Sequence, residues 1–157
     1  MKLQKASTQS HESVIKLYID KSIAELSHIK PYWAFGDDAD KVLNKIQLPI
    51  HKTYKIFEVY TNELIENALF YEVNLDTLFT TDITNNYRIA RILYNWENTT
   101  HLDPPTISLR DNNKELSFID GRHRAKVSYL LGFKKIPIAV ENIDIEMIRR
   151  IITLNEY

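Results

Sequence analysis

Apolar residues recur every three to four positions in several stretches of the chain, a spacing that predicts amphipathic helices. In the clearest of them, the apolar face runs from Tyr87 to Trp96 and leaves Arg88 and Arg91 off that face. Residues 82–86 precede it with side chains suited to capping and turning, as expected at a helix start. The remaining helices are predicted over residues 10–26, 62–71, 121–131 and 143–154.

Runs rich in β-branched and aromatic residues alternate with these helices and predict strands. Pro104 and Pro105 mark a loop, because paired prolines cannot join a helix interior or a central strand. Residues 111–114 (Asp-Asn-Asn-Lys) are typical of a hairpin turn. Interleaved strands and helices predict an α/β (α+β) fold, a small mixed sheet with flanking helices. The strands are expected over residues 49–60, 70–75, 106–110, 115–119 and 135–140.

Composition narrows the class of protein. The chain has 157 residues, of which 44% are hydrophobic and 26% charged, as expected for a globular domain with a sizeable core. It has no cysteine, which excludes disulfides, thiolate metal sites and thiol catalysis. The N-terminus lacks the apolar core of a secretory signal, and no run reaches the roughly 18 apolar residues of a membrane span. We therefore expect a soluble, cytoplasmic protein that does not bind membranes.

Positive charge gathers around one predicted helix start. The formal net charge is −1, so any affinity for phosphate has to come from a local patch. Such a patch follows Gly121, because no acidic residue occurs between Gly121 and Lys135. Cations are mildly unfavourable at the positive end of a helix dipole, so their presence there needs an explanation. The basic residues of this patch are Arg122, Arg124, Lys126, Lys134 and Lys135.

A bound anion explains this placement. A strand runs into Asp120, Gly121 allows a tight turn, and the first backbone N–H groups of the following helix lack intrahelical partners. The two guanidinium groups of Arg122 and Arg124 can grip phosphate oxygens, and His123 can donate a hydrogen bond or move a proton. The alternative is that the arginines form ordinary ion pairs with nearby carboxylates and hold no ligand.

The span from Pro104 to Val140 resembles the ParB/sulfiredoxin superfamily. The shared pattern is a strand after a proline, a turn, a strand that ends in Asp-Gly-x-His-Arg, a helix that ends in Leu-Gly, and a strand that opens with Ile-Pro. Here the central motif is Asp120–Arg124, and the helix closes at Leu131-Gly132. The resemblance implies a ParB/sulfiredoxin-like domain over residues 49–157, with residues 1–48 as an added N-terminal helical element packed on it.

The resemblance also implies a function and a set of site residues. Members of the superfamily bind CTP or ATP with Mg²⁺ and include NTPases, kinases and proteins described as nucleases, and they hold nucleotide phosphates at the matching helix start. By this resemblance Asp120, His123 and Arg124 are the catalytic candidates. The residues expected to bind phosphate are Gly121, Arg122, His123, Arg124 and Lys126.

Departures from the pattern limit what carries over. Sulfiredoxin activity is excluded, because the chain has no cysteine. We do not expect centromere binding of the partition-protein kind, since that needs further domains after this module. Acidic residues outside the motif serve the kinase and nuclease members. The candidates for that role are Asp103, Asp76 and Glu72.

Three interpretations of function stay open at this point. The first is an enzyme of phosphoryl or phosphodiester chemistry. The second is a regulator or inhibitor of plasmid or phage type that binds nucleotide, DNA or RNA without turnover; Tyr32, Trp33 and Phe35 would serve base stacking there, or else pack in the core. The third is a domain that has lost its ligand. Residues 37–40, with three aspartates, are interpreted as an acidic helix start, with a metal site as the alternative.

Overall fold

The computed structural model describes residues 8–36, 54–110 and 115–157. Its fold is α+β and is built on one mixed sheet of five strands in the order β1-β5-β3-β4-β2. β1 and β5 pair antiparallel, β5 and β3 parallel, β3 and β4 antiparallel, and β4 and β2 parallel. The strands are β1 (Tyr54–Tyr60), β2 (Ala68–Leu69), β3 (Thr106–Leu109), β4 (Leu116–Asp120) and β5 (Lys135–Glu141).

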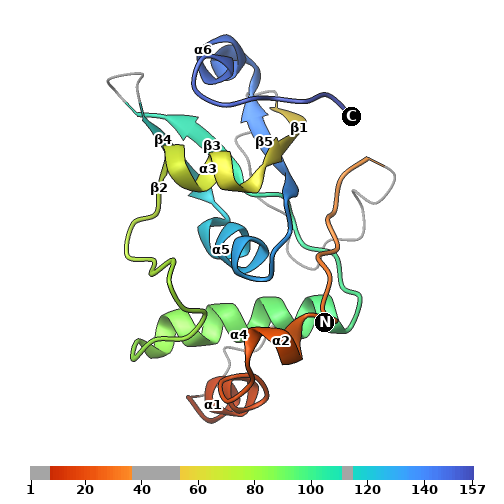
Figure 1. Ribbon diagram of the computed structural model, residues 1–157, viewed down its shortest axis with the longest axis vertical. Helices are drawn as coiled ribbons and strands as arrows, with labels where there is room; N and C mark the ends of the chain where they lie inside the picture. Colours follow the sequence, from red (N-terminus) through yellow and green to blue (C-terminus); the bar gives the residue numbers. More distant parts are fainter. Residues whose placement is uncertain (1–7, 37–53, 111–114) are drawn as a thin grey trace.

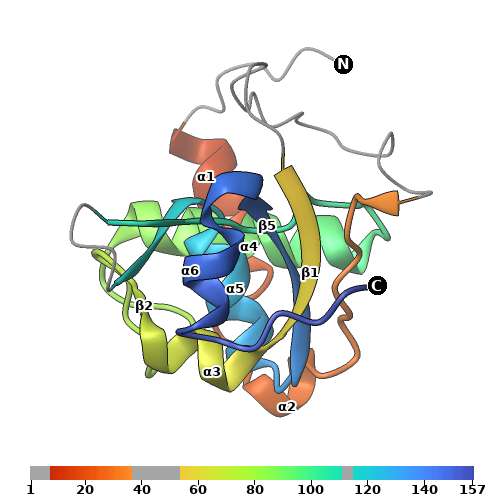
Figure 2. The ribbon, with the colours of Figure 1, turned by 90° about the horizontal axis from the view of Figure 1, so that it is seen from above.

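The helices are arranged in layers on this sheet. α5 lies between the sheet and α4, while α1 lies on the far side of α4 (Figure 1). α6 lies on the opposite side of the sheet from α5, as the view from above shows (Figure 2). The helices are α1 (Thr8–Lys16), α2 (Ile23–Leu26), α3 (Thr61–Asn67), α4 (Ile83–Glu97), α5 (Arg122–Leu130) and α6 (Ile145–Arg149), with the 3-10 helix η2 (Asn142–Asp144) before α6.

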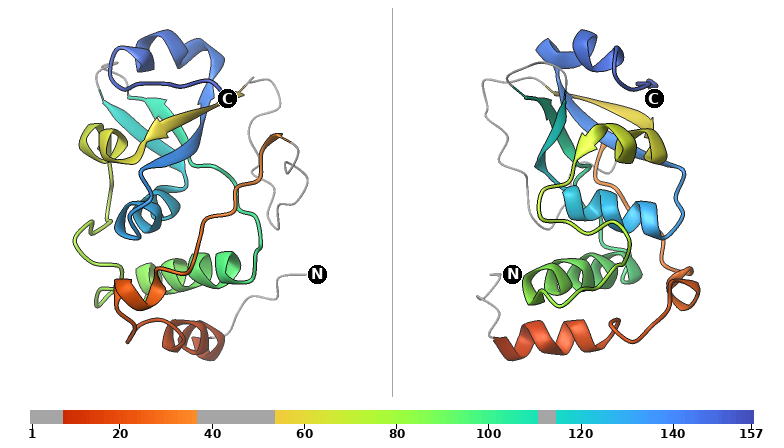
Figure 3. Two further views of the ribbon diagram at one scale, coloured as in Figure 1. Left: turned by 45° about the vertical axis from the view of Figure 1, so that its right-hand side comes forward. Right: turned by 60° about the vertical axis from the view of Figure 1, so that its left-hand side comes forward.

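Two hydrophobic clusters hold these layers together, and α5 contributes to both. One cluster packs the segment of α1 and α2 against α4 and includes Val127 of α5. The other fills the space around the sheet, α3 and α6, and includes Ala125 of α5. The two turned views in Figure 3 show α5 between the sheet above it and α4 below it. Since α5 has a neighbour on each side, most of its side chains are buried.

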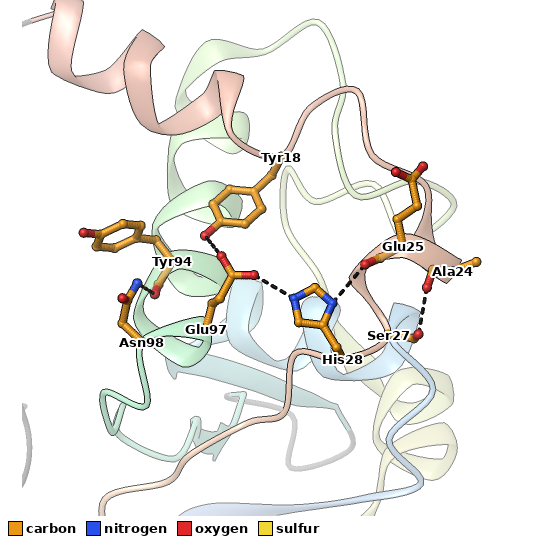
Figure 4. Close-up of polar contacts among 8 residues, drawn as sticks. All are labelled: Tyr18, Ala24, Glu25, Ser27, His28, Tyr94, Glu97 and Asn98. Atoms are coloured by element: carbon orange, nitrogen blue, oxygen red, sulfur yellow. Dashed lines mark hydrogen bonds and ion pairs between the residues drawn. The ribbon is translucent and has the colours of Figure 1, made fainter.

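A polar cluster of Tyr18, His28 and Glu97 ties the N-terminal segment to α4 (Figure 4). The Tyr18 hydroxyl donates to Glu97 Oε1 at 2.9 Å, and His28 Nε2 lies 2.7 Å from Glu97 Oε2. His28 Nδ1 lies 3.0 Å from the carbonyl oxygen of Glu25. Both ring nitrogens of His28 therefore lie within hydrogen-bond distance of an oxygen atom. We call this group the Glu97 cluster.

The Glu97 cluster also shifts the pKa values of its members. The hydrogen bond from His28 is the largest cause that lowers the pKa of the Glu97 carboxyl, so the carboxylate is the favoured form. Burial, followed by the bond to Glu97, raises the pKa of the Tyr18 hydroxyl. The two donors of the cluster, Tyr18 and His28, both have Glu97 as an acceptor within the protein.

Several predicted elements match the structure and four do not. The helix expected over 87–96 is α4, where Asp82 Oδ1 accepts from the Thr84 N–H at 2.8 Å. The single helix expected over 10–26 is wrong, because Ser22 and Glu25 form a capping box that starts α2 separately. The expected strand at 70–75 is wrong, as the chain turns there with Glu72 at φ 55°.

The other two differences concern helix ends. The helix expected over 62–71 ends at Asn67, since β2 begins at Ala68 and pairs with β4. The helix expected over 143–154 ends at Arg149, and the chain beyond it returns to the sheet, where Asn155 forms a bridge to Glu58 of β1. The expected hairpin turn at 111–114 lies outside the described residues, as does the expected boundary at 48/49. Within the described ranges, no helix combines the length and the apolar character that a bilayer crossing needs.

Candidate functional site

The β4–α5 junction is built around Gly121. β4 ends at Asp120, and Gly121 caps α5 with φ 91°, a left-handed conformation. A Cβ at this position would lie 2.7 Å from Pro105 Cα and 2.8 Å from Arg124 Nη2. Glycine is therefore required at position 121 for two reasons: its backbone angle is left-handed, and the loop before β3 approaches too closely to leave room for a Cβ.

The first turn of α5 carries three basic side chains and no acidic one. Gly121 offers no side chain to cap the helix, and the helical ladder starts with the Ala125 N–H donating to the Gly121 carbonyl at 3.0 Å. The N–H groups of Arg122, His123 and Arg124 precede that bond and have no intrahelical acceptor. The positive end of the α5 dipole and two guanidinium groups thus lie at the same place.

This helix start opens into a pocket of about 400 Å³ between α4 and α5. Among the described residues, four arginines line it, two from α4 and two from α5, together with His123 and a single carboxylate, that of Asp120. We call it the arginine pocket. Its lining residues are Arg88, Arg91, Ile92, Asn95, Leu102, Asp120, Gly121, Arg122, His123 and Arg124.

The positive charge in the arginine pocket is only partly balanced by the protein. Arg124 Nη2 lies 3.1 Å from Asp120 Oδ2, one turn back along the chain. Among the described residues, Arg88, Arg91 and Arg122 form no ion pair. The Nε atoms of Arg122 and Arg124 are buried and have no hydrogen-bond partner within the described part of the chain. Buried polar atoms are nearly always satisfied, and an acceptor bound in the pocket could satisfy these two.

His123 lies in the same pocket and is only 9% exposed. Burial, followed by the charges of Arg122 and Arg88, lowers the pKa of its imidazole to about 4. The ring is therefore neutral near pH 7, with one nitrogen as donor and the other as acceptor. A bound anion would offset the part of this shift that comes from the neighbouring positive charges.

Lys126 is placed apart from the other predicted phosphate-binding residues. Its side chain is fully buried and does not line the pocket. Nζ donates to Asn85 Oδ1 of α4 at 3.3 Å, and burial lowers the pKa of the ammonium to about 8. It joins α5 to α4 and lies outside the lining, so the structure does not bring it together with the other predicted phosphate-binding residues. The other predicted site residues, Asp120 to Arg124, are brought together.

Sequence reasoning missed the α4 half of the pocket. Arg88, Arg91 and Asn95 line it, and each is one helical turn from the next on α4. This polar stripe beside the apolar face was a usable signal, but nothing in the sequence says that the stripe faces α5. Lys134 and Lys135 lie beyond the other end of α5 and are not part of the lining.

The acidic candidates do not join the pocket. Asp76 and Glu72 are exposed in the segment after β2, and Asp103 is part-buried before β3; none of the three lines the pocket. The described residues contain no group of three His, Asp or Glu side chains that could hold a metal ion. With Asp120 already paired to Arg124, these residues do not fit a magnesium ion held by the protein. The alternative metal site at residues 37–40 lies outside the described residues.

The aromatic cluster expected to stack bases is divided among three packing contacts. Trp33 packs edge-on against Trp96 with ring centroids 5.1 Å apart, and Phe35 contacts Tyr157 at 4.8 Å. Tyr32 contacts His101 at 5.6 Å. Tyr32 and Trp33 also border the cluster around α4, so packing accounts for these side chains.

Comparisons of the chain with models of known protein families, with curated proteins and with solved structures found no match. The geometry of the arginine pocket is therefore the basis on which a function is proposed.

Proposed function

We propose that the arginine pocket binds a nucleotide through its phosphates, in the manner implied by the resemblance to the ParB/sulfiredoxin superfamily. One observation carries the proposal: four guanidinium groups and a helix N-terminus meet in one pocket, whose described lining contains a single carboxylate. Like charges held this close repel one another, and an anionic ligand removes that cost while it satisfies the unpaired Nε atoms.

The shape of the site favours a small ligand over a nucleic-acid strand. A volume of about 400 Å³ lies within the range of roughly 300–1,000 Å³ that is typical of pockets for small organic molecules. Ile92 and Leu102 supply apolar surface to the same pocket, and Asn95 supplies an amide. In this arrangement an anionic group lies at the α5 start, and a base or sugar lies against Ile92, Leu102 and Asn95.

The second part of the proposal is that the protein catalyses a reaction of the bound phosphates, in which three residues of the pocket have separate roles. Arg122 would stabilise charge that develops on a phosphoryl group. The neutral His123 would take the proton from an attacking hydroxyl or water. Asp120 holds Arg124 in place through their ion pair. The activity is then NTPase, kinase or nuclease chemistry, whereas a protein without turnover would act as a regulator.

Binding is tested by thermal shift with ATP, CTP, GTP and inorganic phosphate, each with and without Mg²⁺. We expect nucleotides to raise the melting temperature of the wild-type chain and to have no effect on Arg122→Gln. Arg150→Gln is the matched control, since it removes the same charge from an exposed side chain just after α6. If no phosphate-containing ligand raises the melting temperature, the proposal is wrong. A shift with DNA or RNA alone, steeply reduced by salt, identifies the nucleic-acid-binding alternative.

Turnover is tested on the same proteins by release of inorganic phosphate from ATP and CTP and by cleavage of single- and double-stranded DNA and RNA. We expect one of these activities in the wild-type chain and in Arg150→Gln, and its loss in His123→Asn. Binding without any of these activities would identify the regulator instead.

A further inference from the structure

The arginine pocket has two basic faces, and they come from different helices. Arg122 and Arg124 belong to the first turn of α5, where the motif places them. Arg88 and Arg91 belong to the middle of α4, one helical turn apart, and no motif predicted them. Both pairs line the same cavity, so a ligand held by the α5 start also meets the α4 face.

The size and charge of the pocket exceed what one phosphate group needs. Among the described lining residues, four guanidinium groups and one carboxylate leave a charge of three positive units when His123 is neutral. A single phosphate group carries at most about two negative charges near neutral pH. The volume of about 400 Å³ is also many times the roughly 30 Å³ that one water molecule occupies in the liquid. Each further linked phosphate adds negative charge and length. A chain of phosphates therefore matches the charge and the volume of the pocket better than a single phosphate group does.

Divalent cations usually reach such ligands through one or two carboxylates of the protein. Of the carboxylates in the part of the chain that the structure describes, only that of Asp120 lines this pocket, and it is paired with Arg124 at 3.1 Å. The guanidinium groups instead present N–H donors that grip phosphate oxygens in pairs. A magnesium ion on the same oxygens would compete with these donors.

We propose that the pocket holds two or more linked phosphates, which run from the α5 start to Arg88 and Arg91, and that guanidinium groups in place of a divalent cation balance their charge. This inference rests on the proposed function and makes it specific. The ligand class is a linear di- or triphosphate, free or as part of a nucleotide, in its metal-free form.

The test is titration calorimetry of the full chain in EDTA with orthophosphate, pyrophosphate and tripolyphosphate. We expect affinity to rise by about tenfold or more with each added phosphate, since charge-assisted hydrogen bonds are the strong ones. The double variant Arg88→Gln/Arg91→Gln should lose most of that gain and keep its affinity for orthophosphate within about threefold. Arg122→Gln should weaken all three ligands. Excess Mg²⁺ should leave tripolyphosphate binding unchanged or weaken it.

A control variant and two nucleotides complete the design. Lys134→Gln/Arg150→Gln removes two positive charges from exposed positions outside the pocket and should keep the full gain with chain length. Binding of ATP or CTP at least as tight as that of tripolyphosphate supports the proposal with a nucleotide as the source of the phosphates.

Three results would overturn the inference while the proposed function stands: equal affinity for the three chain lengths, an undiminished gain in Arg88→Gln/Arg91→Gln, or binding that requires Mg²⁺. If the wild-type chain binds none of these ligands, the proposed function fails as well.

Discussion

α4 carries two polar clusters that differ in how their charges are matched. Near its C-terminal end, Glu97 accepts from Tyr18 and His28, and every donor in the cluster meets an acceptor of the protein (Figure 4). About two turns earlier on the same helix, Arg88 and Arg91 meet the basic start of α5, where Asp120 is the single carboxylate among the described residues that line the pocket. The Glu97 cluster is complete and the arginine pocket is not.

This contrast shows how a structural polar cluster can be told from a binding site. Burying a polar or charged group is costly unless it is paired, so a cluster that serves the fold contains its own partners. A cluster that lacks them destabilises the fold and is explained when a ligand supplies the partner. If this distinction is right, changes in the Glu97 cluster should weaken the fold, whereas removal of charge from the arginine pocket should strengthen it.

The largest expected effect comes from the backbone of the pocket. Gly121→Ala should lower the free energy of unfolding by about 2–4 kcal/mol, because it adds left-handed strain to a clash with Pro105. Gly132→Ala is the control: Gly132 has φ 85°, but a Cβ there would meet no atom within 4 Å, so strain alone should cost about 1–2 kcal/mol. Urea denaturation of both variants measures the difference. Equal losses would show that the approach of Pro105 does not matter.

The pH dependence of stability should report the buried His123. Its pKa is about 4 in the folded protein, below its ordinary value of 6.5, so between these two values the unfolded chain binds more protons. Stability should therefore rise by about 2–3 kcal/mol as pH increases from 4 to 6.5, and fall again as pH decreases.

Comparison with His123→Asn isolates this contribution from the carboxylates that titrate in the same range. The difference in unfolding free energy between the two proteins should follow that pH window and be flat above it. Sulfate, which stays a dianion throughout, should reduce the dependence if it binds beside the imidazole. A pH-independent difference would mean that His123 is not held in its neutral form by the fold.

A smaller loss is expected when the Glu97 cluster is broken. Glu97→Gln removes the charge that His28 faces while it keeps an acceptor for Tyr18, so stability near pH 7 should fall by about 1 kcal/mol. Glu66→Gln, on the exposed side of α3, should change it by less than about 0.5 kcal/mol. Guanidinium denaturation of the wild-type chain, Glu97→Gln and Glu66→Gln measures these changes in the free energy of unfolding. No loss in Glu97→Gln would remove the contrast between the two clusters.

The smallest effect has the opposite sign. Arg122→Gln should stabilise the ligand-free protein by about 0.3–1 kcal/mol, because it removes a cation from the positive end of the α5 dipole and from its basic neighbours. The same substitution should abolish stabilisation by phosphate ligands. Differential scanning calorimetry with and without pyrophosphate measures both. A destabilised ligand-free variant would mean that Arg122 serves the fold.

Features set by neighbouring residues could be predicted from the sequence. The helix α4 follows from its periodicity and the Asp82 cap, and the junction at Gly121 follows from a strand, a glycine and a helix in succession. The break between α1 and α2 was missed, because the capping box of Ser22 and Glu25 outweighs an apolar pattern that continues across it.

Features set by packing could not be predicted in the same way. From the helical pattern alone, Arg88 and Arg91 are expected on the exposed face of a helix. Only the packing of α4 against α5 brings them into the pocket. Lys126 was expected near the phosphate because it follows the motif closely in sequence. Its burial arises because α5 has α4 on one side and the sheet on the other, which no periodicity along α5 reveals.

The position of α5 between two hydrophobic clusters has a consequence for cooperativity. Val127 belongs to the cluster around α4 and Ala125 to the cluster around the sheet, so the two layers meet through one helix. A ligand that contacts both α4 and α5 would stabilise the packing of the two layers against each other. Amide protons of α1, which packs on the far face of α4, should then exchange with solvent more slowly, although α1 touches no part of the cavity.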